Sequence, residues 1–273
     1  MKMTRREWIG GAAAAGLLQA NPLGLPIGCQ TYPVRNEIAQ DFPGTLKTLR
    51  AAGMETIELC SPHSYREFSA LAKMGTAEIT RAIRAAGLKC ESCHYGFREL
   101  KENLDERIAF AKGLGLKQMV LSTFGLPASA TLADWKSSAD KYNEIAQKIR
   151  SAGIAAGYHN HTNEFHQLDG VLIYDELLRR LDSKLIGLQF QTGVISLGYQ
   201  AAPYFTKYPG RYLSIHVSDW SPAEKKQVAV GTGEIDWKKL FAAAKTGGVK
   251  NYFLEMALDP MEASVPYLRG LKV

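Results

Sequence analysis

The chain has 273 residues, of which 46% are hydrophobic and 10% aromatic, and its formal net charge at pH 7 is +6. This length suffices for one large core, and barrel domains of about 250 residues are routinely single units. Basic residues are scattered, with no run longer than a pair outside the N-terminus, which argues against nucleic-acid binding. No stretch reaches the roughly 18 apolar residues of a stable membrane span.

The first twenty residues are typical of an export signal. Arg5 and Arg6 precede a weakly apolar run over residues 10–18, and Ala20 ends a segment suited to cleavage. Paired arginines before such a run indicate the twin-arginine route. We therefore expect residues 1–20 to be a signal peptide and residues 21–273 to be a periplasmic or cell-envelope domain. An ordinary amphipathic N-terminal helix is the alternative.

Eight short apolar runs predict β-strands, and a helical pattern follows each of them. The runs lie near residues 27–32, 54–60, 89–94, 118–123, 154–160, 185–191, 212–217 and 251–256, with a final helix near 261–269. Strict alternation of strand and helix indicates a parallel sheet, and eight units favour a single-domain α/β fold, the (β/α)8 TIM barrel. A doubly wound open sheet is the alternative, but no phosphate-binding loop follows the first strand.

A short unit recurs where the predicted helices end, and it consists of a basic residue, two further residues and a glycine. The glycines are Gly53, Gly87, Gly115, Gly153 and Gly248. Such a glycine stops a helix in a left-handed cap, and a basic residue suits the helix C-terminus. The first four glycines are spaced by 34, 28 and 38 residues, which fits one strand–helix unit each.

All six histidines stand at the end of a predicted strand or a few residues beyond it. They are His63, His94, His159, His161, His166 and His216. Parallel strands of a barrel end on one face, where barrel enzymes carry their active sites, so these side chains are expected to converge there. Histidine titrates near neutral pH and binds metal. His63 and His166 lie in loops and are expected only at the rim.

Other candidate side chains stand at the same strand ends. They are Glu58, Glu164, Gln189, Gln191, Asp219, Trp220 and Glu255. Two or three histidines with carboxylates can bind a divalent cation, and nitrogen donors favour zinc, manganese, iron or cobalt over magnesium.

Four segments in this order resemble the xylose-isomerase-like TIM barrel family, which belongs to the AP endonuclease 2 superfamily. They are Gly157-Tyr158-His159-Asn160-His161 with Glu164-Phe165, Ser214-Ile215-His216-Val217-Ser218-Asp219, Gly231-Thr232-Gly233-Glu234-Ile235-Asp236-Trp237 and Phe253-Leu254-Glu255-Met256. The family includes sugar and sugar-phosphate isomerases and epimerases, inosose dehydratases, keto-glycoside-cleaving lyases and the endonuclease IV branch. The resemblance covers nearly everything after residue 26.

The resemblance implies a metal held from strands five to eight by a glutamate, an aspartate, a histidine and a glutamate. His216 and Glu255 match the last two of these ligands. The match on strand five is ambiguous, because a histidine-rich segment precedes Glu164. Gln191 stands where the family has the aspartate, and an amide oxygen is a weaker ligand than a carboxylate. Ser218 replaces a lysine of the family, so this centre is altered.

The resemblance further implies a sugar isomerase or epimerase that acts on a carbohydrate or polyol by proton transfer next to a carbonyl, through an enediolate. A divalent metal (Mn, Zn, Co or Mg) would assist. The expected catalytic residues are Glu255, His94 and Glu58, since carboxylates and histidines move protons. The expected substrate-binding residues are His159, His161, Gln189, Asp219 and Trp220. The expected metal ligands are His216, Glu255, Glu164 and Gln191.

Other functions stay open. Gln191 and Ser218 favour a carbohydrate-binding protein that has lost catalysis, and a keto-glycoside lyase would share the enolate-like step. Export and the scattered basic residues count against a nuclease. The particular sugar and the oligomeric state, a homo-oligomer included, stay open as well.

Three short patterns resemble sites that we do not expect to form. The glycines around Thr232 precede Asp236, which is expected to cap a helix, so we predict a turn and no nucleotide site. Cys90, Cys93 and His94 match the attachment pattern of c-type haem. Cysteines three apart on a regular strand, however, face opposite sides about 10 Å apart, so we expect no haem. Cys29 and Cys60 are expected on adjacent strands, where they either form a disulfide or remain two buried free thiols.

Overall fold

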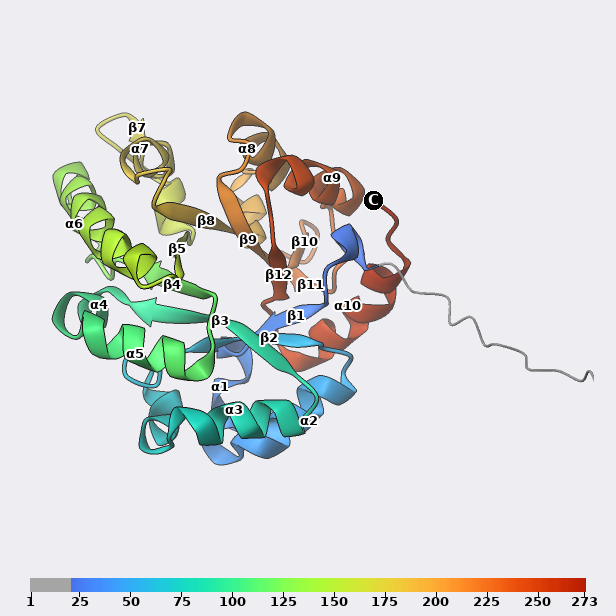
Figure 1. The fold of residues 1–273 in the computed structure, drawn as a ribbon. Helices are drawn as coiled ribbons and strands as arrows, with labels where there is room; N and C mark the ends of the chain where they lie inside the picture. Colours follow the sequence, from blue (N-terminus) through green and yellow to red (C-terminus); the bar gives the residue numbers. More distant parts are fainter. Residues whose placement is uncertain (1–20) are drawn as a thin grey trace, which may run out of the picture.

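Eight parallel strands close into a barrel, and helices surround it on the outside (Figure 1). The computed structural model describes residues 21–273, and the predicted signal peptide lies outside these residues. Around the barrel the strands follow the order β1 (Gly28–Gln30), β12 (Asn251–Leu254), β9 (Tyr212–Val217), β8 (Ile186–Gln191), β5 (Ala155–His159), β4 (Gln118–Thr123), β3 (Lys89–Gly96) and β2 (Thr56–Cys60). The predicted single-domain TIM barrel is confirmed, and the open sheet is excluded.

The helices connect successive strands along the chain. They are α1 (Arg35–Gln40), α2 (Phe42–Ala51), α3 (Thr76–Ala85), α4 (Phe97–Glu102), α5 (Leu104–Leu114), α6 (Leu132–Ser151), α7 (Ile173–Arg180), α8 (Ala201–Lys207), α9 (Trp237–Gly247) and α10 (Leu258–Gly270). Short 3-10 helices occupy several loops, namely η1 (Pro22–Gly24), η2 (Tyr32–Val34), η3 (Arg66–Lys73), η4 (Asn163–Phe165) and η5 (Thr192–Leu197). Among residues 21–273, none of these helices has the length and apolarity needed to cross a bilayer.

Two small antiparallel hairpins lie in the loops that follow β5 and β9. The first pairs β6 (Gln167–Leu168) with β7 (Val171–Leu172), and the second pairs β10 (Asp219–Ser221) with β11 (Lys226–Val228). The sequence did not predict them, because strands of two or three residues carry no periodic pattern.

The repeated glycines end helices as the sequence predicts. Gly53, Gly87, Gly115, Gly153 and Gly248 all have positive φ, between 74° and 97°. The next strand of the barrel begins within a few residues of each glycine, so the caps fix where the strands start. The Asp236 side chain accepts a hydrogen bond from the backbone N–H of Lys239, which confirms the predicted cap of α9.

Side chains alternate between the barrel interior and the layer beneath the helices. On β2, Glu58 reaches across the interior to residues of β8 and β9, whereas Ile57 and Leu59 are buried on the outer side. The Cys60 Sγ lies 3.5 Å from Oε1 of Gln30, so Cys60 faces inward. Cys29, the neighbour of Gln30, therefore faces outward. Both thiols are free and buried, which decides against the disulfide.

β3 carries an irregularity in its pairing with β2, which shifts between Cys90 and Ser92. Ser92 and His94 both face the interior, where they contact Glu58. The shift leaves Cys90 and Cys93 opposite outward-facing residues of β2, so the two thiols share the outer side of the strand. Regular alternation had predicted opposite sides, and that expectation was wrong because of the bulge.

Asp219 organises the loop between β9 and α9, although we expected it to bind substrate. Its buried carboxylate accepts five hydrogen bonds, from the backbone N–H groups of Trp220, Gly231, Gly233 and Ile235 and from Nε1 of Trp237. Gly233 is required here, because a Cβ at that position would lie 2.3 Å from Oδ1 of Asp219. Both oxygens are thus occupied by the protein, and the glycines form a turn around a carboxylate.

Removal of this carboxylate should destabilise the protein strongly. Asp219→Ala leaves several buried donors without an acceptor, and each costs about 1–3 kcal/mol, so we expect the free energy of unfolding to fall by at least about 3 kcal/mol. Asp236→Ala, which removes one exposed cap nearby, should cost about 1 kcal/mol. Urea unfolding of both variants measures the difference, and equal losses would contradict this role for Asp219.

Candidate active site

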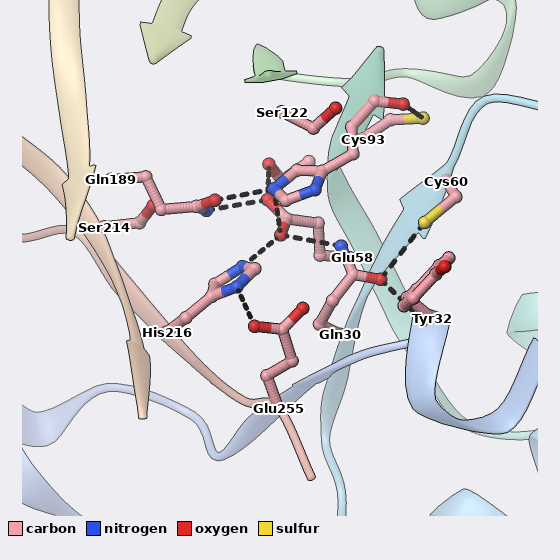
Figure 2. A network of polar contacts seen from close by, with 12 residues as sticks. Gln30, Tyr32, Glu58, Cys60, Cys93, Ser122, Gln189, Ser214, His216 and Glu255 are labelled. Carbon is pink, nitrogen blue, oxygen red and sulfur yellow. Dashed lines mark hydrogen bonds and ion pairs between the residues drawn. The ribbon is translucent and has the colours of Figure 1, made fainter. Parts of the chain in front are cut away.

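His216 lies between two carboxylates at the C-terminal end of the barrel (Figure 2). Its Nε2 is 2.6 Å from Oε2 of Glu58, and its Nδ1 is 3.0 Å from Oε2 of Glu255. The side chains of Glu58 and His216 are fully buried, whereas that of Glu255, just beyond β12, is 19% exposed. Glu255 is therefore the carboxylate of this group that a ligand at the barrel mouth can reach.

These contacts favour charge on all three groups. Burial alone would lower the pKa of His216, but Glu255 and Glu58 raise the pKa to about 9. Burial alone would raise the pKa of Glu255, but His216 lowers it to about 2. Against the same effect of burial, His94 and His216 hold the pKa of Glu58 well below its usual range. At neutral pH, a positive charge on His216 is thus stabilised between two negative charges.

Glu58 forms the floor of the site rather than part of its surface. Its carboxylate accepts hydrogen bonds from Gln30 Nε2, Ser92 Oγ and Gln189 Nε2 at 3.0, 2.5 and 2.9 Å, in addition to its contact with His216. We expected Glu58 to be an acid–base partner of the substrate. A fully buried carboxylate with this many protein partners instead acts through His216, so we describe Glu58 as a positioning residue.

Two further histidines surround His216 inside the barrel. The ring of His94 stacks on that of His216 with centroids 5.0 Å apart, and the ring of His159 lies 4.4 Å from that of His216. Ligand atoms of the three histidines lie within 4.8 Å of one another. The Nε2 of His94 is 2.6 Å from Oε1 of Gln189 and 3.1 Å from Oε2 of Glu58. The Nε2 atom of His94 is therefore already bound by other side chains of the protein.

His159 differs from its neighbours because both of its ring nitrogens are buried without a hydrogen-bond partner. Burial and the nearby histidines hold its pKa well below the usual range, so the ring is neutral. Buried polar atoms are nearly always paired, and an unpaired one points to a missing partner. The exposed ring of His161 packs edge-on against His159 at 4.7 Å.

The two remaining expected ligands are occupied by the protein. The side-chain amide of Gln191 donates to Oε2 of Glu255, and its Oε1 accepts from the backbone N–H of Gly193 at 3.1 Å. Glu164 accepts from the Tyr158 hydroxyl at 2.7 Å and from the backbone N–H of His161 at 2.9 Å. Tyr158 precedes the inward-facing His159 on β5, so Glu164 lies on the outer side of that strand.

The structure thus brings together His216, Glu255, Gln191, His94 and Gln189, all predicted from the sequence, and it puts His159 rather than Glu164 beside His216. His63 and His166 are exposed in loops, as expected, and Trp220 is half-buried on β10. The sequence analysis missed Gln30, Ser92 and Ser214, which complete the polar floor. Their signal was a polar residue at an inward position of an otherwise apolar strand.

The comparisons with known proteins agree with this barrel. A family model described as xylose isomerase-like TIM barrel matches residues 46–268, so the chain belongs to that family. No curated protein matches the chain. Among solved structures, a sugar phosphate isomerase/epimerase from Parabacteroides distasonis is similar, with 23% identity, a TM-score of 0.74, and coverage of 91% of this chain and 96% of that one.

Two further solved structures are named as epimerases. An L-ribulose 3-epimerase shares 16% identity, with a TM-score of 0.66 and coverage of 89% of this chain and 93% of that one. A D-psicose 3-epimerase from Clostridium cellulolyticum, solved with D-tagatose, shares 11% identity, with a TM-score of 0.68 and coverage of 90% and 99%. At these identities the likeness establishes the fold alone.

Members of this family often bind a divalent metal, and the donors present here fit one. The unpaired nitrogens of His159 lie beside His216, and His216 lies beside the Glu255 carboxylate. The three residues that would hold a cation are therefore His94, His159 and His216, whose ligand atoms lie within 4.8 Å of one another, and Glu255 lies beside His216. Gln191 supports Glu255 through its side-chain amide. Glu164 does not belong to this group, because it pairs with Tyr158 on the outer side of β5.

The free energy of unfolding should depend on pH through Glu164, which lies outside the group around His216. Burial raises its pKa to about 7, above the ordinary value of 4.5. A raised pKa means that its contribution to stability is fully present below pH 4.5 and is lost as pH rises through 7. The loss amounts to about 3 kcal/mol by pH 8. Glu164→Gln should remove this loss.

The free energy of unfolding of the wild type minus that of Glu164→Gln, measured by urea between pH 4 and pH 8, should therefore fall as pH rises. Glu144→Gln, in an exposed ion pair with Lys141, should give a flat difference. A flat difference for Glu164→Gln as well would show that the pKa of this carboxyl is the same in the folded and the unfolded protein.

Proposed function

We propose that the chain is an exported sugar isomerase or epimerase that moves a proton next to a carbonyl of a small carbohydrate or polyol. One observation supports this proposal above the others. Glu255, an ionised and partly exposed carboxylate, stands at the barrel mouth and is oriented by a buried histidine and a second carboxylate. The neighbouring structures named as sugar isomerases and epimerases favour a sugar as substrate.

In this proposal Glu255 accepts the proton from the carbon next to the carbonyl. It is deprotonated because His216 lowers its pKa, and Gln191 holds one of its oxygens in place. A bound divalent cation would polarise the carbonyl and stabilise the enediolate charge. His161, exposed on the β5 side of the mouth, is the second group able to return a proton. His94 is too deeply buried and engaged for that role and supports the neighbouring rings instead.

The second candidate function is carbohydrate binding without catalysis. The contact between the Gln191 amide and Glu255 favours it. A carboxylate at position 191 would add a negative charge to the site, whereas the neutral amide adds none. A keto-glycoside lyase would use the same proton abstraction and then expel the group on the neighbouring carbon.

The loss of the Glu255 carboxylate should abolish proton exchange. We expect the wild type with a divalent cation to exchange the proton next to the carbonyl of L-ribulose or D-tagatose with D2O. Glu255→Gln should lower the rate by about 10²–10⁴-fold, which is the usual contribution of a general base. Glu262→Gln, on the exposed side of α10, serves as the matched control and should exchange like the wild type. NMR of the sugar measures the exchange.

Undiminished exchange by Glu255→Gln would remove Glu255 from the proposed chemistry. Sugar binding by the wild type without any exchange would establish the binding protein instead. Release of a leaving group from a keto-glycoside, detected in the same NMR spectra, would establish the lyase.

Export by the twin-arginine route is the remaining part of the proposal. Conversion of both Arg5 and Arg6 to lysine should keep the protein in the cytoplasm, because the paired arginines are the routing signal. Fractionation of cells should find the wild type in the periplasm with a mature chain that starts at Asn21. Equal periplasmic amounts of wild type and the double-lysine variant would contradict the route.

A further inference from the structure

We propose that the face of the barrel opposite the mouth docks on a bilayer surface rich in anionic lipid headgroups. The parallel strands of the barrel all begin on this face. The proposed chemistry takes place at the mouth, so the inference goes beyond it. We call the surface the basic face and define it by six lysine and arginine side chains where strands begin and beyond the last helix. They are Lys89, Lys117, Lys184, Arg211, Lys250 and Lys272.

The first support is the repeated unit that ends the helices. Its basic residue, before the glycine, suits the helix C-terminus, and this effect falls off within the last turn. In three of the units a second basic residue follows the glycine, as Gly87-Leu88-Lys89, Gly115-Leu116-Lys117 and Gly248-Val249-Lys250. These three lysines are exposed and lie beyond the caps. Helix capping therefore does not explain them, and they add charge to the surface where the strands begin.

The second support is the topology, which gathers these charges on one face. The helices return from the mouth, and a lysine or arginine stands in the last turn of α2, α3 and every helix from α5 to α10. Within residues 21–273, the acidic side chains between helix ends and strand starts are Glu55 and Asp182, and Glu91 follows in β3. Glu55 accepts a hydrogen bond from Asn21, and Asp182 accepts one from the backbone N–H of Lys184. Basic side chains therefore dominate this face.

The third support is a cavity of about 410 Å³ that opens on the basic face. It lies between the end of α9, the start of β12 and the residues on either side of the barrel, and it is lined by Lys245, Lys250 and Lys272. All three lysines are exposed. Ammonium groups donate charge-assisted hydrogen bonds to phosphate oxygens, so the cavity suits the phosphate of a lipid headgroup.

The position of Asn21 selects a bilayer among anionic partners. Asn21 lines the same cavity, and its Nδ2 donates to Oε1 of Glu55 at 2.9 Å. The predicted export signal, with Arg5 and Arg6, therefore joins the barrel on the basic face. Since an export signal leads a chain to the membrane, the basic face is the part of the barrel closest to lipid. This step rests on the export proposed above. Glu255, at the mouth, faces away from the bilayer and stays accessible.

The test measures binding to vesicles by co-sedimentation. The closed barrel lies wholly within residues 21–273, so a chain of these residues is used. It should bind vesicles that contain phosphatidylglycerol about 100-fold more tightly than vesicles of phosphatidylcholine alone, because each basic residue near an anionic surface contributes about fivefold. Raising the salt from about 0.1 M to about 0.5 M should weaken this binding by about tenfold or more.

Two triple variants that remove the same charge locate the surface. Conversion of Lys89, Lys117 and Lys250 to glutamine should weaken binding to the phosphatidylglycerol vesicles by about 100-fold. The matched control converts Lys225, Lys238 and Lys239 to glutamine. These exposed lysines lie in the loop after β9 and in the first turn of α9, on the mouth side. Because they are farther from the bilayer than a Debye length, the control should bind within about threefold of the wild type.

Circular dichroism confirms that both variants are folded, and single substitutions at the same positions replace a triple variant that is not. Equal losses in the two variants would show attraction by net charge alone and would overturn the proposal. Equal binding to the two kinds of vesicle would overturn it as well. Binding to heparin, a soluble anionic polymer, without binding to vesicles would identify a different partner and also overturn it. No sugar is present, so each of these outcomes is independent of the proposed proton transfer.

Discussion

One buried negative charge, on the carboxylate of Glu58, constrains the interior of this barrel. An ionised carboxylate in a protein interior is costly unless it is paired and hydrogen-bonded. Glu58 meets this requirement with donors from four other strands, β1, β3, β8 and β9. The carboxylate therefore links walls of the barrel that are distant in sequence, and it fixes the direction in which His216 presents its outer nitrogen.

The same constraint explains why the upper interior is polar. Barrel interiors are usually filled by layers of branched apolar side chains. Here the layer around Glu58 consists of amides, hydroxyls and imidazoles joined by hydrogen bonds, and Glu255 is the partly exposed carboxylate at the end of this network. A preorganised site of this kind fixes its charges before a ligand arrives, which is how enzymes stabilise developing charge without reorganisation. The ring nitrogens of His159 have no hydrogen-bond partner, and the cation of the proposed function would give one of them a partner.

The fold was predictable because local signals and topology agreed. Each apolar run is preceded by a glycine-ended helix or a loop, so the eight strands lie within about two residues of their expected bounds. The two hairpins were not predictable, since their strands are too short to show a period. The bulge in β3 was not predictable either, and it turned Cys90 and Cys93 to the same side.

The site was predictable as a location and only partly as a set of roles. Strand ends identified His216, Glu255 and His94 because parallel strands share one active face. The choice between His159 and Glu164 depended on which face of β5 each side chain occupies, and Glu164 turned out to pair with Tyr158 on the outer side. Asp219 also stood at a strand end, but its five donors come from a loop whose path the sequence does not specify.

The proposed chemistry depends on a divalent cation held among the buried imidazoles of His94, His159 and His216, beside Glu255 and above the Glu58 floor. Anomalous diffraction at the zinc absorption edge, from crystals grown with Zn²⁺, locates such a cation directly. We predict an anomalous peak within bonding distance, about 2.0–2.2 Å, of a nitrogen of His159 and of a nitrogen of at least one neighbouring histidine, His94 or His216. The absence of a peak at this position, with His159 still unpaired in the electron density, would contradict this prediction.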